Sequence, residues 1–226
     1  MNNVYSVAID GPSGAGKSSV ARAAAQKLGF LYVDTGAIYR TVGLAAFRRG
    51  IGSRDHDAVT AMLPELDIRL AYGDDGLQHM FLDGENVSSE IRLPEISIYA
   101  SDVSAYPEVR AYLMEMQRSL ARTNSVIMDG RDIGTVVLPD AGLKIFLTAS
   151  PEARAQRRLL ELEKKGQSVA FEEVLRDIQY RDKNDSERAA APLKQAEDAV
   201  LVDTTDIDFD ESCAAVEKLI RERFAL

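Results

Sequence analysis

The sequence contains one cysteine and no tryptophan, and its two histidines, His56 and His79, lie far apart. A single cysteine excludes a disulfide within the chain. The spacing of Cys213 with Val216 and Ile220 puts it on the buried face of a predicted helix. Two isolated histidines lack the spacing of zinc ligands. No apolar run approaches the roughly 18 residues of a membrane span, and no signal peptide fits the first residues. We therefore expect a cytoplasmic protein without a membrane partner.

Positive charge is also scarce. The 226 residues include 36 Asp and Glu against 27 Lys and Arg, a net charge of −9. This balance argues against a broad nucleic-acid surface, so we expect no nucleic-acid partner. An anionic ligand must then be bound by local arginines and backbone N–H groups. The acidic surface and the absence of an obvious apolar patch favour a monomer.

One glycine-rich stretch has a clear chemical meaning. Residues Gly11 to Ser18 have the spacing G-x-x-x-x-G-K-S, between an apolar run, Val4–Ile9, and a helical pattern that ends at Leu28. Such a loop turns backbone N–H groups toward phosphates, and Lys17 can reach the β- and γ-phosphates. Chance matches occur, but the strand before and the helix after give the expected context. The stretch predicts a nucleoside triphosphate site with Mg²⁺, without identifying the acceptor.

Short apolar runs alternate with helical patterns along most of the chain, which is typical of an α/β protein with a parallel sheet. We predict five parallel strands with helices on both faces. The five predicted strands are Val4–Asp10, Phe30–Val33, Ser125–Met128, Leu143–Leu147 and Val200–Val202. Other predicted helices run from Ala37 to about Arg49, from Pro107, from Pro151 to Lys165, from Phe171 to about Arg181, and over Glu211–Phe224.

Two regions do not fit this sheet. Residues 51–102 contain an alternating, turn-rich pattern that predicts a small antiparallel meander, and we interpret them as an inserted mixed α/β subdomain. Residues 151–188 predict a charged helical hairpin that could act as a lid. The core of this single unit would then be 1–50, 103–150 and 189–226.

Acidic residues follow several predicted strands. In open α/β sheets, ligands bind at the carboxyl ends of the strands. Asp10, Asp129 and Asp132 are therefore candidates for an environment that binds Mg²⁺. Asp34 is a candidate too, although capping the following helix explains it equally well.

The arginines fall into two sets. One set belongs to the predicted hairpin and would serve the donor together with Lys17: Arg154, Arg157 and Arg158 on its first helix, and Arg181 and Arg188 at its base. A solvated, salt-bridged helix is the alternative explanation for Arg154. If the second helix continues, Arg181, Asp185 and Arg188 share one face. The other set, Arg40, Arg110 and Arg131, is dispersed along the chain. Arginine suits phosphate because its planar group donates paired hydrogen bonds. Two sets of cations predict phosphoryl transfer to an acceptor that is itself phosphorylated.

Four segments together resemble bacterial cytidylate kinases. They are Gly11–Ser18, Asp34-Thr35-Gly36-Ala37-Ile38-Tyr39-Arg40, Asp129-Gly130-Arg131-Asp132-Ile133-Gly134-Thr135, and Arg181-Asp182 to Arg188 with Ala191-Pro192-Leu193. The resemblance extends from the first strand to the last helix, and the middle insert resembles the enlarged monophosphate-binding region of that family. It implies a Mg²⁺-dependent reaction of ATP with CMP or dCMP that gives ADP and CDP or dCDP, in pyrimidine nucleotide metabolism.

The resemblance also implies roles for individual residues. For catalysis it implies Lys17, Arg131, Asp132 and Arg188. For ATP it implies Gly11, Pro12, Ser13, Gly14, Ala15, Gly16, Lys17, Ser18, Ser19, Arg157 and Arg158. For the acceptor it implies Thr35, Arg40, Ser101, Arg110, Arg131, Asp132, Arg181, Asp185 and Arg188. The family usually has Gly-Thr after the lysine where this chain has Ser18-Ser19, so either hydroxyl could meet the Mg²⁺ ion.

Other functions share part of this pattern. A kinase of another nucleoside monophosphate such as UMP stays open, because spacing alone does not identify the base. A regulatory GTPase would read guanine with Asn-Lys-x-Asp, and no Asn in the chain is followed by Lys. A non-catalytic nucleotide-binding module would bind ATP without acceptor-dependent turnover.

Overall fold

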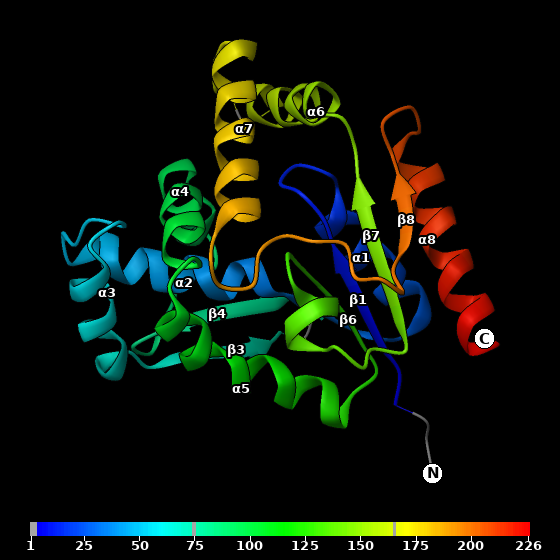
Figure 1. The fold of residues 1–226 in the computed structure, drawn as a ribbon, viewed down its shortest axis with the longest axis horizontal. Coiled ribbons are helices and arrows are strands. Elements are labelled where there is room, and N and C mark those ends of the chain that lie inside the picture. Colours follow the sequence, from blue (N-terminus) through cyan, green and yellow to red (C-terminus); the bar gives the residue numbers. More distant parts are fainter. Residues whose placement is uncertain (1–3, 74–75, 165) are drawn as a thin grey trace. The chain divides into compact units, whose positions relative to one another are not determined.

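The computed structural model describes residues 4–73, 76–164 and 166–226, and the chain divides into two compact units (Figure 1). The P-loop unit consists of Met1–Tyr32 and Ala121–Leu226, and the central unit is Val33–Leu120. Each unit has its own apolar core. The division into core, insert and lid stays a prediction; the central unit contains all of the predicted insert, 51–102, and the helix before it.

A five-stranded sheet has the order β2-β6-β1-β7-β8. Its strands are β1 (Ser6–Asp10), β2 (Leu31–Asp34), β6 (Val126–Gly130), β7 (Leu143–Thr148) and β8 (Val200–Asp203). β1 lies parallel to β6 and to β7, and β7 lies parallel to β8. These pairings confirm the predicted parallel sheet. Because β1 is central, the loop that follows it starts between the carboxyl ends of β6 and β7, where ligands bind in such sheets.

Two helices of the P-loop unit share the core of the sheet. α1 (Lys17–Leu28) contributes Val20 and Ala24, and α8 (Phe209–Phe224) contributes Val216 and Ile220. Cys213 is buried in the same cluster, as its spacing predicted. The apolar faces of both helices therefore follow the helical period that the sequence indicates.

The predicted helical hairpin consists of α6 (Pro151–Lys164) and α7 (Phe171–Glu187), which have a small apolar core of their own. Figure 1 shows α6 following the carboxyl end of β7. The predicted last residue of α6, Lys165, lies outside the described residues. α7 continues past its predicted end at Arg181 to Glu187, so Arg181 and Asp185 are one turn apart on the same helix.

The central unit combines helices with a small antiparallel sheet. Its helices are α2 (Thr35–Arg48), α3 (His56–Met62), α4 (Pro94–Val103) and most of α5 (Pro107–Thr123), with short 3₁₀ turns at Leu63–Glu65 and Glu90–Arg92. The sheet contains β3 (Ile68–Tyr72), β4 (Gln78–Leu82) and β5 (Glu85–Asn86) in that order. The predicted meander is confirmed, although residues 74–75 of its first turn lie outside the described residues.

Three local features differ from the predictions. α2 begins at Thr35 rather than Ala37, because the carboxylate of Asp34 caps it by accepting the Ala37 N–H at 2.9 Å. The sequence patterns did not predict α4, whose residue Ile96 is buried in the central core. They also did not predict the π-helical turn Ile133–Val137 after β6.

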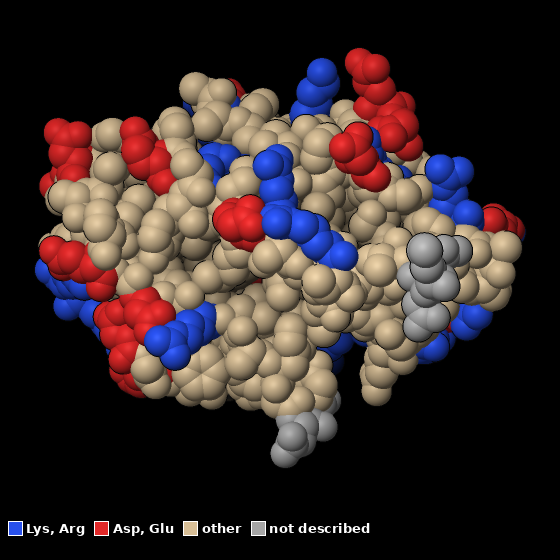
Figure 2. All heavy atoms as spheres, turned by 90° about the horizontal axis from the view of Figure 1, so that it is seen from below, with Lys and Arg blue, Asp and Glu red and all other residues tan. Residues whose placement is uncertain are grey.

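Charged side chains of both signs are present on the surface. Figure 2 shows acidic and basic groups interspersed on the face that it presents. Within the part of the chain that the structure describes, no helix is both long and apolar enough to cross a bilayer.

Candidate active site

The glycine-rich loop takes a path that only glycine permits at its first position. Gly11 has φ 150°, and a Cβ atom there would lie 1.9 Å from the backbone oxygen of Leu147 in β7. The loop ends at Gly16, the N-cap of α1, which has φ 90° and offers no side-chain acceptor to the first N–H groups of that helix. Those N–H groups and the positive end of the helix suit an anion. This geometry fits the phosphates of a nucleotide.

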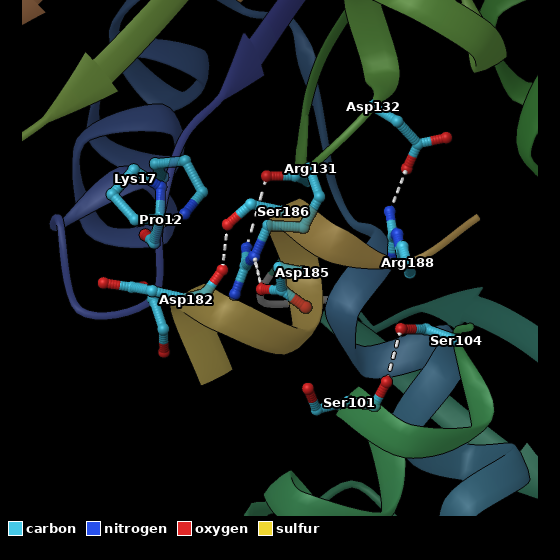
Figure 3. A network of polar contacts seen from close by, with 12 residues as sticks. Pro12, Lys17, Ser101, Ser104, Arg131, Asp132, Asp182, Asp185, Ser186 and Arg188 are labelled. Carbon is cyan, nitrogen blue, oxygen red and sulfur yellow. Dashed lines mark hydrogen bonds and ion pairs between the residues drawn. The ribbon is translucent and has the colours of Figure 1, made fainter. Parts of the chain in front are cut away.

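Lys17 is buried inside this loop. Its ammonium group donates to the backbone oxygen of Pro12 at 2.8 Å (Figure 3). Burial holds the pKa of Lys17 well below its ordinary value, and the charge of Arg131 lowers that pKa further. A bound phosphate would supply the negative charge that a buried ammonium group requires.

Ser18, one of the two predicted Mg²⁺ ligands, contacts an acid at the end of a strand. The Ser18 hydroxyl donates to Oδ2 of Asp129 at 2.8 Å, and the Tyr32 hydroxyl donates to Oδ1 of the same carboxylate at 2.9 Å. Ser19 is exposed on α1. A hydroxyl and a carboxylate are oxygen ligands of the kind that Mg²⁺ prefers, and in nucleotide sites the phosphates supply several of the others. The residues present therefore fit a Mg²⁺ ion bound with a nucleotide.

Two arginines near the loop are paired with acids of the same unit. Nε of Arg131 donates to Asp185 at 2.7 Å, and Arg188 donates to Oδ1 of Asp132 at 3.3 Å (Figure 3). Burial alone would raise the pKa of Asp185, but Arg131, then Arg181 and Arg188, hold it below the ordinary value. The buried Asp185 carboxylate thus orders the Arg131 guanidinium group, and the charges of two more arginines act on it. A cluster of oriented cations of this kind can bind phosphate oxygens.

Arg154 corrects one interpretation. It is not on a solvated face, since only 3% of the residue is exposed. Its guanidinium donates to the backbone oxygen of Ser13 at 2.8 Å and to both carboxylate oxygens of Asp182 at 3.0 and 2.6 Å. Arg154 therefore joins both helices of the hairpin to the glycine-rich loop. The sequence pattern does not indicate this contact, because the partners of Arg154 lie far away along the chain.

The other two hairpin arginines have different surroundings. Arg157 donates to the Thr204 hydroxyl at 3.0 Å, and Arg158 forms an ion pair with Glu161 at 3.1 Å. Their predicted contact with ATP stays a prediction.

The central unit has a cation cluster around Asp34. This buried carboxylate lies 2.8 Å from Arg92 and 3.9 Å from Arg40. Burial would raise its pKa, and the charges of Arg40 and Arg92 hold that pKa below the ordinary value. The side-chain amide of Gln78 in β4 accepts the backbone N–H of Asp34 at 2.8 Å and donates to the backbone oxygen of Asp34 at 3.1 Å. Thr35, the first residue of α2, is buried next to this cluster in the chain.

A second polar group of the central unit links α4 and α5. Ser101 is buried on α4, and its backbone oxygen accepts the Ser104 hydroxyl at 2.8 Å (Figure 3). Arg110 of α5 donates to the backbone oxygen of Ser104 at 3.3 Å and lies over the ring of Tyr39, 5.6 Å from its centroid. The structure thus groups the predicted residues Ser101 and Arg110.

Several residues with contacts in these clusters were not singled out from the sequence. They are Tyr32, Gln78, Arg92 and Asp182. Asp182 lies next to Arg181 in one of the four segments that resemble cytidylate kinases, so its position in the sequence could have identified it as a candidate. Nothing in the sequence pattern marks Gln78 or Arg92, because their partner Asp34 is 44 and 58 residues away.

Comparison with known proteins supplies the family context. A family model described as cytidylate kinase matches residues 7–222. A cytidylate kinase of Caldicellulosiruptor bescii is 50% identical over 213 residues, covering 94% of this chain and 94% of that protein. One of Thermosipho melanesiensis is 49% identical over 220 residues, covering 97% and 98%. Among solved structures, shikimate kinase from Bacteroides thetaiotaomicron has a TM-score of 0.50 at 14% identity, covering 98% and 99%, which is a likeness of fold.

Proposed function

Because the chain belongs to the cytidylate kinase family, we propose that it transfers the γ-phosphoryl group of ATP to CMP and dCMP, giving ADP and CDP or dCDP. The observation that carries this proposal is the family match over 7–222, which includes the glycine-rich loop and every arginine discussed above. Phosphoryl transfer of this type needs little covalent chemistry from the protein. It needs aligned substrates and positive charge around the moving group.

The donor is ATP, bound by the backbone of Gly11–Gly16, by Lys17 and by the N-terminus of α1. We assign the Mg²⁺ contact to Ser18, because its hydroxyl lies 2.8 Å from Asp129 whereas Ser19 is exposed. Asp129 would then hold the ion directly or through water. A bound Mg²⁺ ion would supply positive charge that offsets the negative charge of the phosphates.

The proposed acceptor residues fall into two groups. Arg40 and Arg110, with Thr35, are proposed to bind the phosphate of CMP. Ser101, Arg181 and Asp185 are proposed to bind its cytosine and sugar. Cytosine presents an amino donor next to ring acceptors, so a carboxylate and an arginine together match its edge. The acid of this set, Asp185, is buried and ordered by Arg131 at 2.7 Å, which supports a fixed position for its carboxylate.

Lys17, Arg131 and Arg188 are the proposed cations of the transition state. Lys17 already lies in the loop, while Arg131 and Arg188 are oriented by Asp185 and Asp132. Pre-oriented charges need no rearrangement when charge develops on the phosphoryl oxygens. An arginine used in this way contributes about 10³ to 10⁵ to the rate in other phosphoryl-transfer enzymes.

The direct test measures ADP release from Mg-ATP with CMP, dCMP, UMP, AMP and GMP in separate reactions. We expect turnover with CMP and dCMP well above the others, and none without an acceptor. Turnover led by UMP, AMP or GMP would identify a different monophosphate kinase. Binding of ATP without any acceptor dependence would leave a non-catalytic module. The Lys17→Ala variant serves as the control, and it should lose kcat while keeping a cooperative unfolding transition.

A further inference from the structure

The loop after β6 carries two of the proposed catalytic residues and lacks a cap of its own. Gly130 ends the strand, Arg131 and Asp132 follow, and Ile133–Val137 forms a π-helical turn. The first N–H groups of a helical turn need acceptors from outside it. Asp132 occupies the N-cap position of this turn, where aspartate usually accepts such a bond, yet its side chain makes none there. Its carboxylate instead accepts from Arg188 at 3.3 Å.

The missing acceptor comes from another strand. Asp10, the last residue of β1, accepts the Ile133 N–H on Oδ1 and the Gly134 N–H on Oδ2, both at 2.7 Å. The approach is close, because a Cβ atom on Gly134 would lie 3.3 Å from that Oδ2 and 3.1 Å from the side chain of Lys144. Asp10 therefore does for this turn what the residue at its N-cap position usually does.

The capping contact lies in a buried environment, because only 5% of Asp10 is exposed. Burial raises the pKa of Asp10 to about 6, and the bonds from Gly134 and Ile133 oppose that rise because they favour the carboxylate. A carboxylate offers an acceptor oxygen to each of the two N–H groups, so the contact depends on the chemistry of this side chain.

We propose that Asp10 is a positioning residue for catalysis: by capping the turn in place of Asp132, it fixes the loop of Arg131 and leaves the Asp132 carboxylate to Arg188. Asp10 also immediately precedes Gly11, so one side chain ties the phosphate-binding loop to the loop of the proposed catalytic arginine. Small displacements of such groups are expensive, since about 1 Å can reduce a rate on the order of 100-fold. The inference rests on the proposed function, because it concerns residues assigned there.

The test compares the full-length wild type with Asp10→Asn in steady-state kinetics with Mg-ATP and CMP. Asparagine has the same shape, but its amide can accept only one of the two N–H bonds and presents a donor to the other. We expect kcat to fall about 10- to 100-fold while KM for ATP stays within about twofold of wild type. The matched control is Asp208→Asn, which weakens the exposed carboxylate cap of α8 and should leave kcat unchanged.

Asp10→Asn with a lower melting temperature but wild-type kcat would reduce Asp10 to a structural role and overturn the inference. If that variant does not fold, Gly134→Ala is the second test, because its methyl group would lie 3.1 Å from the Lys144 side chain and 3.3 Å from Oδ2 of Asp10, so that Lys144, Asp10 or the turn must shift. It should lower kcat in the same way, and a normal kcat would overturn the inference. If the wild type uses another monophosphate, the proposed function fails, and the same comparison made with that acceptor still decides. A wild type without acceptor dependence overturns both.

Discussion

Replacing Asp185 with alanine removes the carboxylate to which Nε of Arg131 donates. Only 3% of Asp185 is exposed, and it lies 2.7 Å from Nε of Arg131, whose side chain is 21% exposed. Removing one partner of a buried ion pair lowers the free energy of unfolding by about 3–5 kcal/mol, because the remaining charge loses its compensation. Since Arg131 keeps some contact with solvent, we expect about 3 kcal/mol at pH 7. With an m value of about 2 kcal/mol per M, the urea midpoint falls by about 1.5 M.

The pH dependence gives this prediction a sign. The pKa of Asp185 is lowered in the folded protein, so its contribution to stability is present above its unfolded pKa of about 3.9 and is lost as the pH falls through the folded value. Urea titrations at pH 7 and at successively lower pH should therefore show the difference between wild type and variant shrinking in acid. A difference below about 1 kcal/mol at pH 7, or one independent of pH, refutes the reasoning.

A control on the same helix separates this effect from helix propensity. Asp177 is exposed on α7, so Asp177→Ala should change the free energy of unfolding by less than about 0.5 kcal/mol. Kinetics then address the proposed role of Asp185 in binding. Asp185→Ala should raise KM for CMP much more than KM for ATP. An equal rise in both would show that Asp185 acts only through the structure.

Three further perturbations test other contacts of the P-loop unit. Gly11→Ala cannot keep the observed loop path, so kcat/KM for ATP should fall at least about 100-fold, as measured by initial rates; near-normal activity would mean that the loop adjusts. Ser18→Ala should raise the Mg²⁺ concentration needed for half-maximal activity, whereas Ser19→Ala should not, and the reverse result would reassign the ligand. Arg154→Ala should lower the free energy of unfolding in urea by about 2–4 kcal/mol; a loss as small as that of the exposed ion pair removed by Lys218→Ala, below about 1 kcal/mol, would contradict it.

The parallel sheet and most of its helices were predictable because their signals are local. Each strand is a short apolar run, and each covering helix repeats apolar residues at the helical period, as Val216 and Ile220 do in α8. α4 escaped prediction because its apolar residues are too few to define a stripe without knowledge of α2, against which it packs. The π-helical turn Ile133–Val137 escaped for a stronger reason. Its cap comes from Asp10, 123 residues away along the chain.

In the candidate site, too, local features were predictable and long-range contacts were not. The phosphate loop was predictable, since its glycines, Lys17 and Ser18 are contiguous and the strand and helix around them are strong patterns. The pairing of each arginine with an acid was not. Arg154 is an example. The charged sequence of α6 is typical of a solvated helix, whereas the partners of Arg154, Ser13 and Asp182, come from distant segments of the chain. A pattern can identify which residue types are present, but their partners follow only from the packing of the elements.

Those partners bear on how a protein with a net charge of −9 can bind two nucleotides. In the P-loop unit Arg131 and Arg188 are held by Asp185 and Asp132, and in the central unit Arg40 lies near Asp34. Asp185 and Asp132 weaken the attraction of their arginines for phosphate but fix the orientation of the guanidinium groups. A loosely held arginine would bind ground-state phosphate well and then lose orientational entropy at each turnover, whereas an ordered one acts where charge develops. Substitution of such an acid should therefore reduce kcat even if phosphate affinity rises, and this combination distinguishes orientation from simple charge attraction.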